Sequence, residues 1–231
     1  MNGPTRIATI SGMVDRVGEW LIVRFESVHA VASWAIVGGG IRQASTVAWR
    51  QVAERTLRPP VDAVQWLRAR MSEAALGDAV GLLTSRDLDS WVESRSDQGG
   101  ARAHCVATVG LGNALRAGDP PGAAAHIGTI NVLCRVDLAL TREALLEALA
   151  IATEAKTAAV LDASVVSRRS GRRATGTGTD CIVIAAPLGS RRAHYAGKHT
   201  AVGAAIGAAV LSAVRTGARQ WSAHHERKAR P

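Results

Sequence analysis

The sequence predicts an α+β fold, in which a mixed, largely antiparallel sheet packs against helices within a single domain. Short apolar runs that are rich in β-branched residues and bounded by turn residues recur along the chain, which is typical of buried strands. Longer segments have apolar residues at helical spacing or are apolar nearly all round, which is typical of helices that cover a sheet. The length of 231 residues suits one domain with a sizeable core.

The elements follow from these patterns in chain order. Strands are predicted at 20–25, 29–37, 79–84, 103–111, 128–136 and 181–186, and helices at 61–76, from 141 onward and at 200–214. The polar, Gly-containing segment Asp87–Arg102 is interpreted as a loop. The chain is accordingly divided into an N-terminal extension (1–18), the domain itself (19–216) and a basic, flexible tail (217–231).

The charge balance suggests an anionic partner, because the formal net charge is +9. Most of the positive charge is Arg, however, and much of it lies in expected loops and in the tail. No helix carries a continuous basic stripe, and no aromatic residues alternate with the Arg residues for base stacking. Specific binding of nucleic acid is therefore not expected.

The three cysteines, Cys105, Cys134 and Cys181, form neither a CxxC spacing nor an even set, and they are interpreted as buried free thiols. The scattered His residues have no metal-ligand spacing, so no metal site is predicted, and His224-His225 is interpreted as a solvated pair. The first fifteen residues lack the apolar region of a signal peptide, and no apolar span of membrane length is evident. A soluble, cytoplasmic protein is expected.

The most informative stretch is 173–186, where alternating Thr and Gly residues lead into an apolar strand. Gly allows the backbone to approach a ligand closely. The hydroxyls of Thr175, Thr177 and Thr179 and the carboxylate of Asp180 would converge where the strand begins. These residues are candidates for substrate binding and catalysis.

A second stretch, Tyr195–Thr200, precedes the Ala- and Gly-rich helix. Thr200 is the natural N-cap, which places Lys198 and His199 at the positive end of the helix, where backbone amides can bind an anion or stabilise an oxyanion. Gly197 permits close approach of the backbone. We expect the two stretches to face each other, with the site between them.

The helix that begins after Thr141 places Glu143, Glu147 and Glu154 on one side at about 100° per residue. Lys156 falls among the apolar residues of the other side. A lysine there must reach solvent, find a partner or line a cavity, and reaching solvent is the commoner outcome. Glu154 is expected to face either solvent or a cleft, and it is included among the catalytic candidates for the second case.

Two Gly-containing turns are weaker candidates. Gly38 and Gly39, in a run of three glycines, could offer amides to an oxyanion or form a tight turn, and the two readings are about equally favoured. Asn113 lies in a turn that does not match GxGxxG, because Leu115 occupies the third Gly position. Asn113 is either a turn residue or a hydrogen-bonding partner of the substrate.

Amide hydrolysis requires a nucleophile, an oxyanion stabiliser and an acid for the leaving amine. His199 is predicted to act as the base, held by Asp180, with Lys156 or the helix amides near Thr200 stabilising the oxyanion. The nucleophile is either water or a Thr hydroxyl. No local triad signature such as GxSxG is present.

The segments Thr175–Ala185 and Tyr195–Thr200 together resemble the signature of the adenosylcobinamide amidohydrolase (CbiZ) family. Further blocks agree in the same order: 37–40, 110–119, 128–131 and 152–158. Asn131 ends the third of these blocks and is a candidate for substrate binding. The resemblance covers roughly Trp20–Val214.

The resemblance implies an enzyme of cobinamide salvage that cuts the amide between the corrin ring and its aminopropanol arm, giving adenosylcobyric acid. The partner would be adenosylcobinamide or a related corrinoid, bound in a wide cleft as substrate, with no cofactor required. The chain departs from the family pattern at Arg50, where an Asn is usual, and at Ala204, where an acid is frequent. These departures keep a non-catalytic corrinoid-binding protein as the alternative, and self-association into a homo-oligomer is left open.

Overall fold

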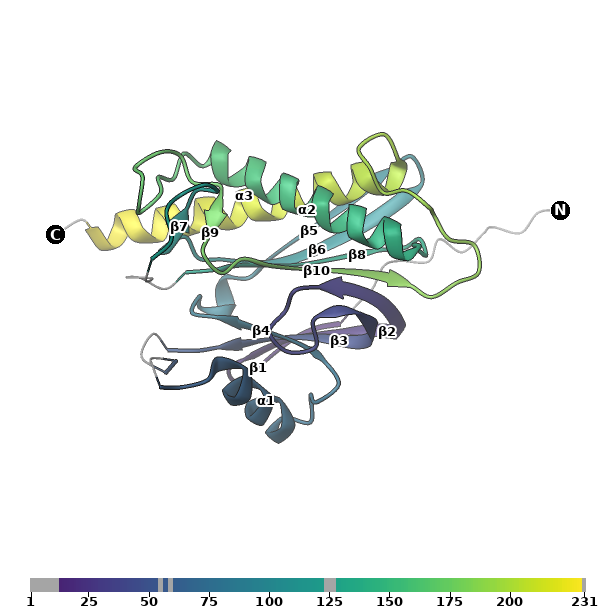
Figure 1. Cartoon of the computed structure of the whole chain (residues 1–231), viewed down its shortest axis with the longest axis horizontal. Coiled ribbons are helices and arrows are strands. Elements are labelled where there is room, and N and C mark those ends of the chain that lie inside the picture. The colour runs from purple at the N-terminus through teal and green to yellow at the C-terminus, as the bar shows by residue number, and fades with distance from the viewer. Residues whose placement is uncertain (1–12, 54–55, 58–59, 123–127, 230–231) are drawn as a thin grey trace.

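The computed structural model describes residues 13–53, 56–57, 60–122 and 128–229 (Figure 1). Most strands belong to one mixed sheet in the order β4-β3-β2-β10-β8-β6-β5, with β1 paired to β2. A separate small sheet joins β7 and β9.

The strands are β1 (Met13–Val17), β2 (Trp20–Ser33), β3 (Gly40–Gln51), β4 (Val80–Thr84), β5 (Val92–Gln98), β6 (Ala101–Val109), β7 (Ala114–Leu115), β8 (Ile130–Val136), β9 (Gly176–Thr177) and β10 (Cys181–Pro187). The helices are α1 (Ala63–Glu73), α2 (Arg142–Asp162) and α3 (Ala201–Ala229), with a short 3-10 helix at Leu88–Ser90.

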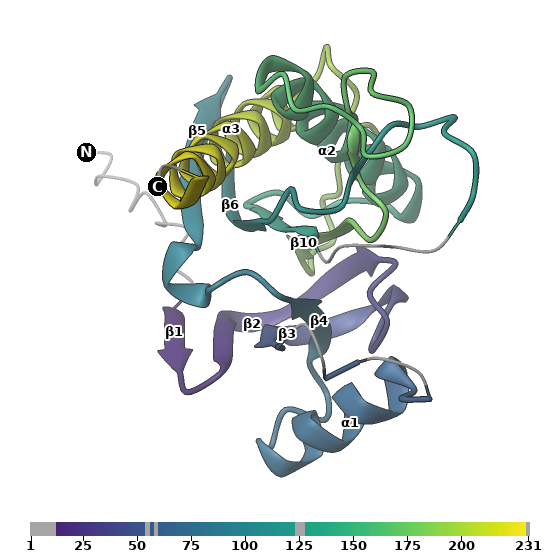
Figure 2. The same ribbon diagram turned by 90° about the vertical axis from the view of Figure 1, so that its left-hand side faces the viewer.

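The predicted fold class is confirmed. Within the large sheet, β10–β8 and β3–β4 are parallel, whereas the pairs β1–β2, β10–β2, β2–β3, β5–β6 and β6–β8 are antiparallel. Helices α2 and α3 cover the part of the sheet formed by β5, β6, β8 and β10, and α1 lies beyond β3 and β4 (Figures 1 and 2). Strands and helices thus alternate along the chain, and both belong to one packed unit.

The large sheet turns back on itself along β2. The last residues of this long strand pair with β10, its first residues pair only with β1 and β3, and its pairing with β3 shifts register between Arg24 and His29. Side chains of β2, β3 and β4 therefore pack against side chains of β6, β8 and β10, as Val47 and Leu82 do with Leu133 and Val183. The layers are, in order, helices α2 and α3, the part of the sheet with β8 and β10, the part with β3 and β4, and helix α1 (Figure 1). Strands β8 and β10 are therefore covered on both faces, which explains their nearly continuous apolar sequences.

Several features differ from the prediction. The segment Asp87–Arg102 is not a loop, because it contains the 3-10 helix and the edge strand β5. Strand β5 alternates exposed and less exposed residues, and its polar composition concealed it. The predicted strand at 29–37 is the second half of β2, which ends at Ser33. Strand β3 was not predicted.

The end of α3 also differs from the prediction. The helix continues through Ala229, so the expected loss of regular structure after Gly217 is wrong. Its 25-residue segment Ala201–His225 is long and apolar enough to cross a membrane by length and composition, contrary to the expectation for the chain. This segment packs against β5, β6 and α2, however, and 56% of its most apolar window is buried, as in the core helix of an α+β fold. Strand β1 begins within the predicted N-terminal extension, of which residues 1–12 lie outside the described part.

The two glycines at close-packing spacing in α3 lie in different environments. A Cβ on Gly203 would lie 2.2 Å from the carbonyl oxygens of Ala196 and Gly197, whereas a Cβ on Gly207 would meet only Ile151, at 3.9 Å. We expect Gly203→Ala to lower the free energy of unfolding by about 1–3 kcal/mol, because backbone atoms must move apart. Gly207→Ala is the matched control, and its effect should be neutral or stabilising by up to about 1 kcal/mol. Urea unfolding of both variants measures the difference, and equal effects would contradict this account.

Candidate active site

The two predicted stretches contact opposite faces of α2. Asp180 binds Lys156 on one face, with 2.7 Å between the carboxylate and the ammonium group. On the other face, Glu147 accepts a hydrogen bond of 2.6 Å from the backbone of Ala196, and Glu154 pairs with Lys198. Lys156 and Glu147 are nine residues apart, which places them roughly 180° apart around a helix. The expectation that the two stretches face each other is therefore wrong.

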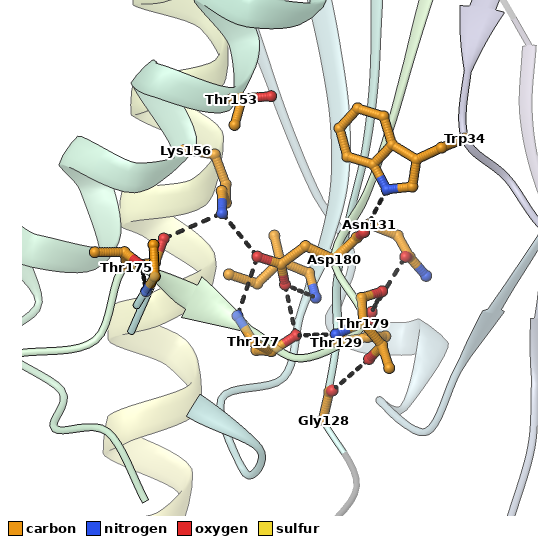
Figure 3. A network of polar contacts seen from close by, with 12 residues as sticks. Trp34, Gly128, Thr129, Asn131, Thr153, Lys156, Thr175, Thr177, Thr179 and Asp180 are labelled. Atoms are coloured by element: carbon orange, nitrogen blue, oxygen red, sulfur yellow. Dashed lines mark hydrogen bonds and ion pairs between the residues drawn. The ribbon is translucent and has the colours of Figure 1, made fainter. Parts of the chain in front are cut away.

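The carboxylate of Asp180 is the centre of a dense polar network (Figure 3). Its Oδ2 accepts from Lys156 at 2.7 Å and from the Thr177 amide at 3.0 Å. Its Oδ1 accepts from the Thr177 hydroxyl at 2.6 Å and from the Ile130 amide at 3.1 Å. Four donors thus occupy the acceptor positions of this nearly buried carboxylate, which compensates the charge for its loss of solvent.

Three elements build this network. Asp180 directly precedes β10, and the parallel pairing of β10 with β8 places Ile130 beside it. Lys156 lies on the face of α2 that covers the sheet, and it also donates to the carbonyl oxygen of Thr175 at 3.1 Å. A Cβ on Gly176 would lie 2.2 Å from Asp180 Oδ2 and 2.5 Å from Lys156 Nζ. Gly at position 176 therefore makes room for the ion pair.

The three predicted Thr hydroxyls have different partners. The Thr175 hydroxyl accepts a hydrogen bond from the amide of Ala117 at 2.8 Å. The Thr179 hydroxyl donates to the carbonyl oxygen of Gly128 at 3.0 Å. Among the three, the Thr177 hydroxyl alone donates to a carboxylate, and it also accepts from the Thr179 amide at 3.3 Å. Thr177 is therefore the predicted Thr whose hydroxyl proton already has a basic acceptor.

A mainly apolar cavity of about 500 Å³ opens beside Asp180, between the two halves of the folded sheet. Leu82 and Ile36 contribute apolar surface, and Thr179, Asp180 and Asn131 form a polar end. The Asn131 side chain is buried and donates to the carbonyl oxygen of Leu83 at 2.7 Å. Asn131 and Thr179, both predicted as substrate-binding residues, thus lie at this cavity.

Cys181 also lines this cavity, but its thiol is a poor nucleophile. Burial raises the pKa of Cys181 to about 11, so the thiol is protonated at neutral pH. The buried thiols of Cys105 and Cys134 have raised pKa values for the same reason. All three cysteines are free, as the sequence indicated.

A second, more polar cavity of about 700 Å³ shares a wall with the first at Ser85 and Gly128. The far end of α3 contributes Trp221, His224 and His225 to it. The ring of His225 stacks on Trp221, with 3.9 Å between the centroids. Within the described ranges, no group of three or more His, Cys, Asp or Glu side chains is placed to hold a metal ion.

Several predicted site residues lie elsewhere. His199 is exposed near the start of α3 and is not among the groups that donate to Asp180, so the prediction that Asp180 holds it is wrong. Glu154 is exposed beside Lys198 on the outer face of α2. Thr200 caps α3, as predicted, by accepting from the Gly203 amide at 3.0 Å. Gly197 packs against the carboxylate of Glu147, which a Cβ on Gly197 would approach to 2.7 Å.

The remaining candidates, Gly38, Gly39 and Asn113, lie where their contacts support turns of the backbone. Gly38 has a φ of +71°, and a Cβ on Gly39 would lie 2.4 Å from the carbonyl oxygen of Ala35, as in a tight turn. Neither is among the residues that line the cavity beside Asp180. Asn113 is buried, and its amide would lie 3.0 Å from a Cβ on Gly178, so it packs against the Thr-Gly turn.

Sequence reasoning missed two residues that support the turn before β10. Thr129 donates to the carbonyl oxygen of Thr179 at 2.8 Å. Trp34 reaches across from the segment after β2 and donates to the carbonyl oxygen of Asp180 at 2.7 Å. Thr129 could have been recognised from the sequence, because it lies two positions before Asn131 in the family-like block 128–131. Nothing in the sequence connects Trp34 with Asp180.

The burial of the Lys156–Asp180 pair leads to a prediction about stability. The two side chains are only 8% and 10% exposed, so Asp180→Asn leaves a buried ammonium group uncompensated and should cost about 3–5 kcal/mol. The double variant Lys156→Met/Asp180→Asn should recover about 1–3 kcal/mol relative to the sum of the single changes. The exposed pair of Lys198 and Glu154 gives the control, since Lys198→Met should cost at most about 1 kcal/mol. Strict additivity in denaturant unfolding would refute the proposed coupling.

Comparison with known proteins gives a family match over nearly the whole chain, a relative that matches over part of it, and solved structures of similar fold. A segment of 82 residues is 39% identical to the uncharacterized protein MJ1613 of Methanocaldococcus jannaschii, covering 35% of this chain and 32% of that protein. The alignment thus spans about a third of the length of that relative.

Two solved structures are similar over most of the chain at 13% identity. The PH0078 protein of Pyrococcus horikoshii has a TM-score of 0.44, with 94% of this chain and 81% of that chain covered. The L-aminopeptidase D-Ala-esterase/amidase of Ochrobactrum anthropi, described as a variant of the Ntn hydrolase fold, has a TM-score of 0.40, with 89% and 81% covered.

The sequence profile of the adenosylcobinamide amidohydrolases matches residues 6–226. This range contains every residue of the Asp180 network and of both cavities. The chain therefore belongs to the adenosylcobinamide amidohydrolase (CbiZ) family of hydrolases.

Proposed function

We propose that this protein hydrolyses the amide that joins the corrin ring of adenosylcobinamide to its aminopropanol arm. The products would be adenosylcobyric acid and the free amino alcohol, so that the corrinoid can re-enter cobalamin synthesis. Membership of the family supports a corrinoid substrate. The specific reaction and its place in salvage are what the family resemblance implies, and they are part of this proposal.

The observation that carries this proposal is the contrast in polarity within the cavity beside Asp180. A corrinoid presents broad apolar ring faces, and amide arms leave from the rim of the ring. The cavity offers apolar walls such as Leu82 and a polar end at Thr179 and Asp180. Sites for organic ligands commonly combine apolar walls with a few placed polar groups. A rim amide would thus meet residues 178–180, which directly follow Thr177, while the ring contacts apolar surface.

Thr177 is the nucleophile in this proposal. Its hydroxyl would attack the carbonyl carbon of the amide while its proton passes to Asp180 along the existing 2.6 Å hydrogen bond. The C–N bond then breaks, the proton held by Asp180 passes to the leaving amine, and the corrinoid acyl group remains as an ester on Thr177. Water hydrolyses this ester and releases the carboxylic acid. Direct activation of water by Asp180 is disfavoured, because four protein donors already occupy its oxygens.

Lys156 would stabilise the negative charge that develops on the amide oxygen. Its ammonium group has three N–H donors, of which Asp180 and the Thr175 carbonyl accept two. Because this cation is mostly buried, its field is weakly screened by solvent. Asp180 would then act in two ways, as the acceptor of the Thr177 proton and as the group that holds Lys156.

The primary test is incubation of the purified protein with adenosylcobinamide, followed by mass analysis of the corrinoid. A product with the mass of adenosylcobyric acid, together with stoichiometric aminopropanol, is the expected result. Binding without any product would instead identify a non-catalytic corrinoid-binding protein.

Thr177 and His199 provide a paired test of the mechanism. Thr177→Ala should lower kcat by at least about 1,000-fold, because no other residue supplies the attacking oxygen, and Thr177→Ser should retain measurable turnover. His199→Ala should retain near-normal turnover, since His199 is exposed and makes no contact with the Asp180 carboxylate. Steady-state kinetics and a search for the corrinoid ester on intact protein measure these outcomes. The mechanism fails if Thr177→Ala is active or His199→Ala is inactive.

A further inference from the structure

The side chain of Trp34 both makes a hydrogen bond to the reacting segment and exposes its ring to the cavity. Its indole N–H donates to the main-chain carbonyl oxygen of Asp180 at 2.7 Å, as Figure 3 shows from the side of the Asp180 network. Its side chain is nevertheless 48% exposed and lines the apolar cavity. The hydrogen bond fixes the orientation of the ring, so an aromatic surface is held in place beside the segment 177–180.

The surroundings of Trp34 are also apolar and open. Ile36, two residues further along, is 43% exposed and lines the same cavity. Leu57 and Ala63 contribute further apolar lining from the segments before and at the start of α1. Exposed apolar groups that gather at a cavity indicate a surface that a ligand covers. A large flat ligand that is apolar on its faces fits this surface.

We propose that Trp34 binds the face of the corrin macrocycle and, through its N–H, positions Asp180 for the reaction. This inference rests on the proposed function. The conjugated macrocycle would lie against the indole, since aromatic rings contribute both apolar contact and stacking. Trp34 is thus a specificity residue through its ring and a positioning residue through its nitrogen.

The two roles link substrate binding to the reacting groups. The Asp180 carbonyl that Trp34 holds belongs to the residue whose carboxylate orients Thr177 and Lys156. A macrocycle that binds against Trp34 therefore contacts a side chain that is hydrogen-bonded to Asp180, the residue directly before β10. This anchoring sets the distance between the macrocycle and the hydroxyl of Thr177. Of the amides on the rim of the ring, the one at that distance would therefore be cut.

Two substitutions separate the roles. Trp34→Phe keeps an aromatic face but removes the N–H donor, so kcat should fall about 2- to 10-fold while KM stays within about twofold. Trp34→Leu also removes the aromatic face, so KM should rise by at least about fivefold in addition. Because Trp34 is half exposed, both variants should fold, and matching circular dichroism spectra and unfolding midpoints verify this. Trp66→Phe on α1 is the matched control and should leave both constants unchanged, since Trp66 does not line the cavity.

Binding of adenosylcobyric acid, measured by equilibrium dialysis, distinguishes this inference from the proposed function. This molecule carries the macrocycle but lacks the amide that is cut, so it reports ring binding alone. Weaker binding to Trp34→Leu but not to Trp34→Phe supports the inference even if the wild-type protein proves inactive as a hydrolase. If Trp34→Leu binds the acid as tightly as wild type, or if both variants change KM equally, Trp34 has no role in ring recognition.

Discussion

The buried ion pair between Lys156 and Asp180 is the constraint on which the arrangement of the site depends. Two charges that are about nine-tenths removed from solvent are costly unless each is paired and hydrogen-bonded. The protein meets this requirement with donors from α2, from β8 and from the Thr-Gly turn, all converging on one carboxylate. The position of α2 over the sheet and the conformation of the turn are therefore fixed by the same few contacts.

The folding of the sheet along β2 places this network and the apolar cavity on neighbouring sides of one short segment. Asp180 sends its carboxylate toward α2, and its main-chain carbonyl accepts from Trp34, which follows β2. The charged groups are thus supported by the helix layer, while the apolar cavity lies between the two parts of the sheet. Gly178, Thr179 and Asp180 line this cavity, so the segment whose carboxylate binds Lys156 is also the segment that a ligand in the cavity would meet.

Much of the fold could be predicted from local sequence, because the covered strands are continuous apolar runs and the helices carry recognisable caps. Thr200 was predicted as an N-cap and a helix was predicted to begin after Thr141, and both hydroxyls accept a backbone amide three residues later. Strands β3 and β5 were not predicted, because their exposed faces carry polar residues. No short-range sequence signal marks their pairing with β2 and β6. The turning of the sheet along β2 depends on contacts between residues far apart in the chain, which local patterns do not encode.

The site shows the same division between local and distant information. Lys156 was placed correctly on the covered face of α2, a property that helical periodicity reveals. The favoured expectation that it reaches solvent was wrong, because its side chain is only 8% exposed and its ammonium group is paired with Asp180. The assignment of His199 relied on its place before a helix N-terminus, and periodicity cannot say at which end of the sheet that helix begins. The start of α3 packs near Gly99, at the β5–β6 turn, whereas Asp180 lies at the other end of these strands, roughly 25 Å away along β6. The far end of α3, which sequence reasoning assigned to a tail, is the part that brings histidines to a cavity adjoining the site.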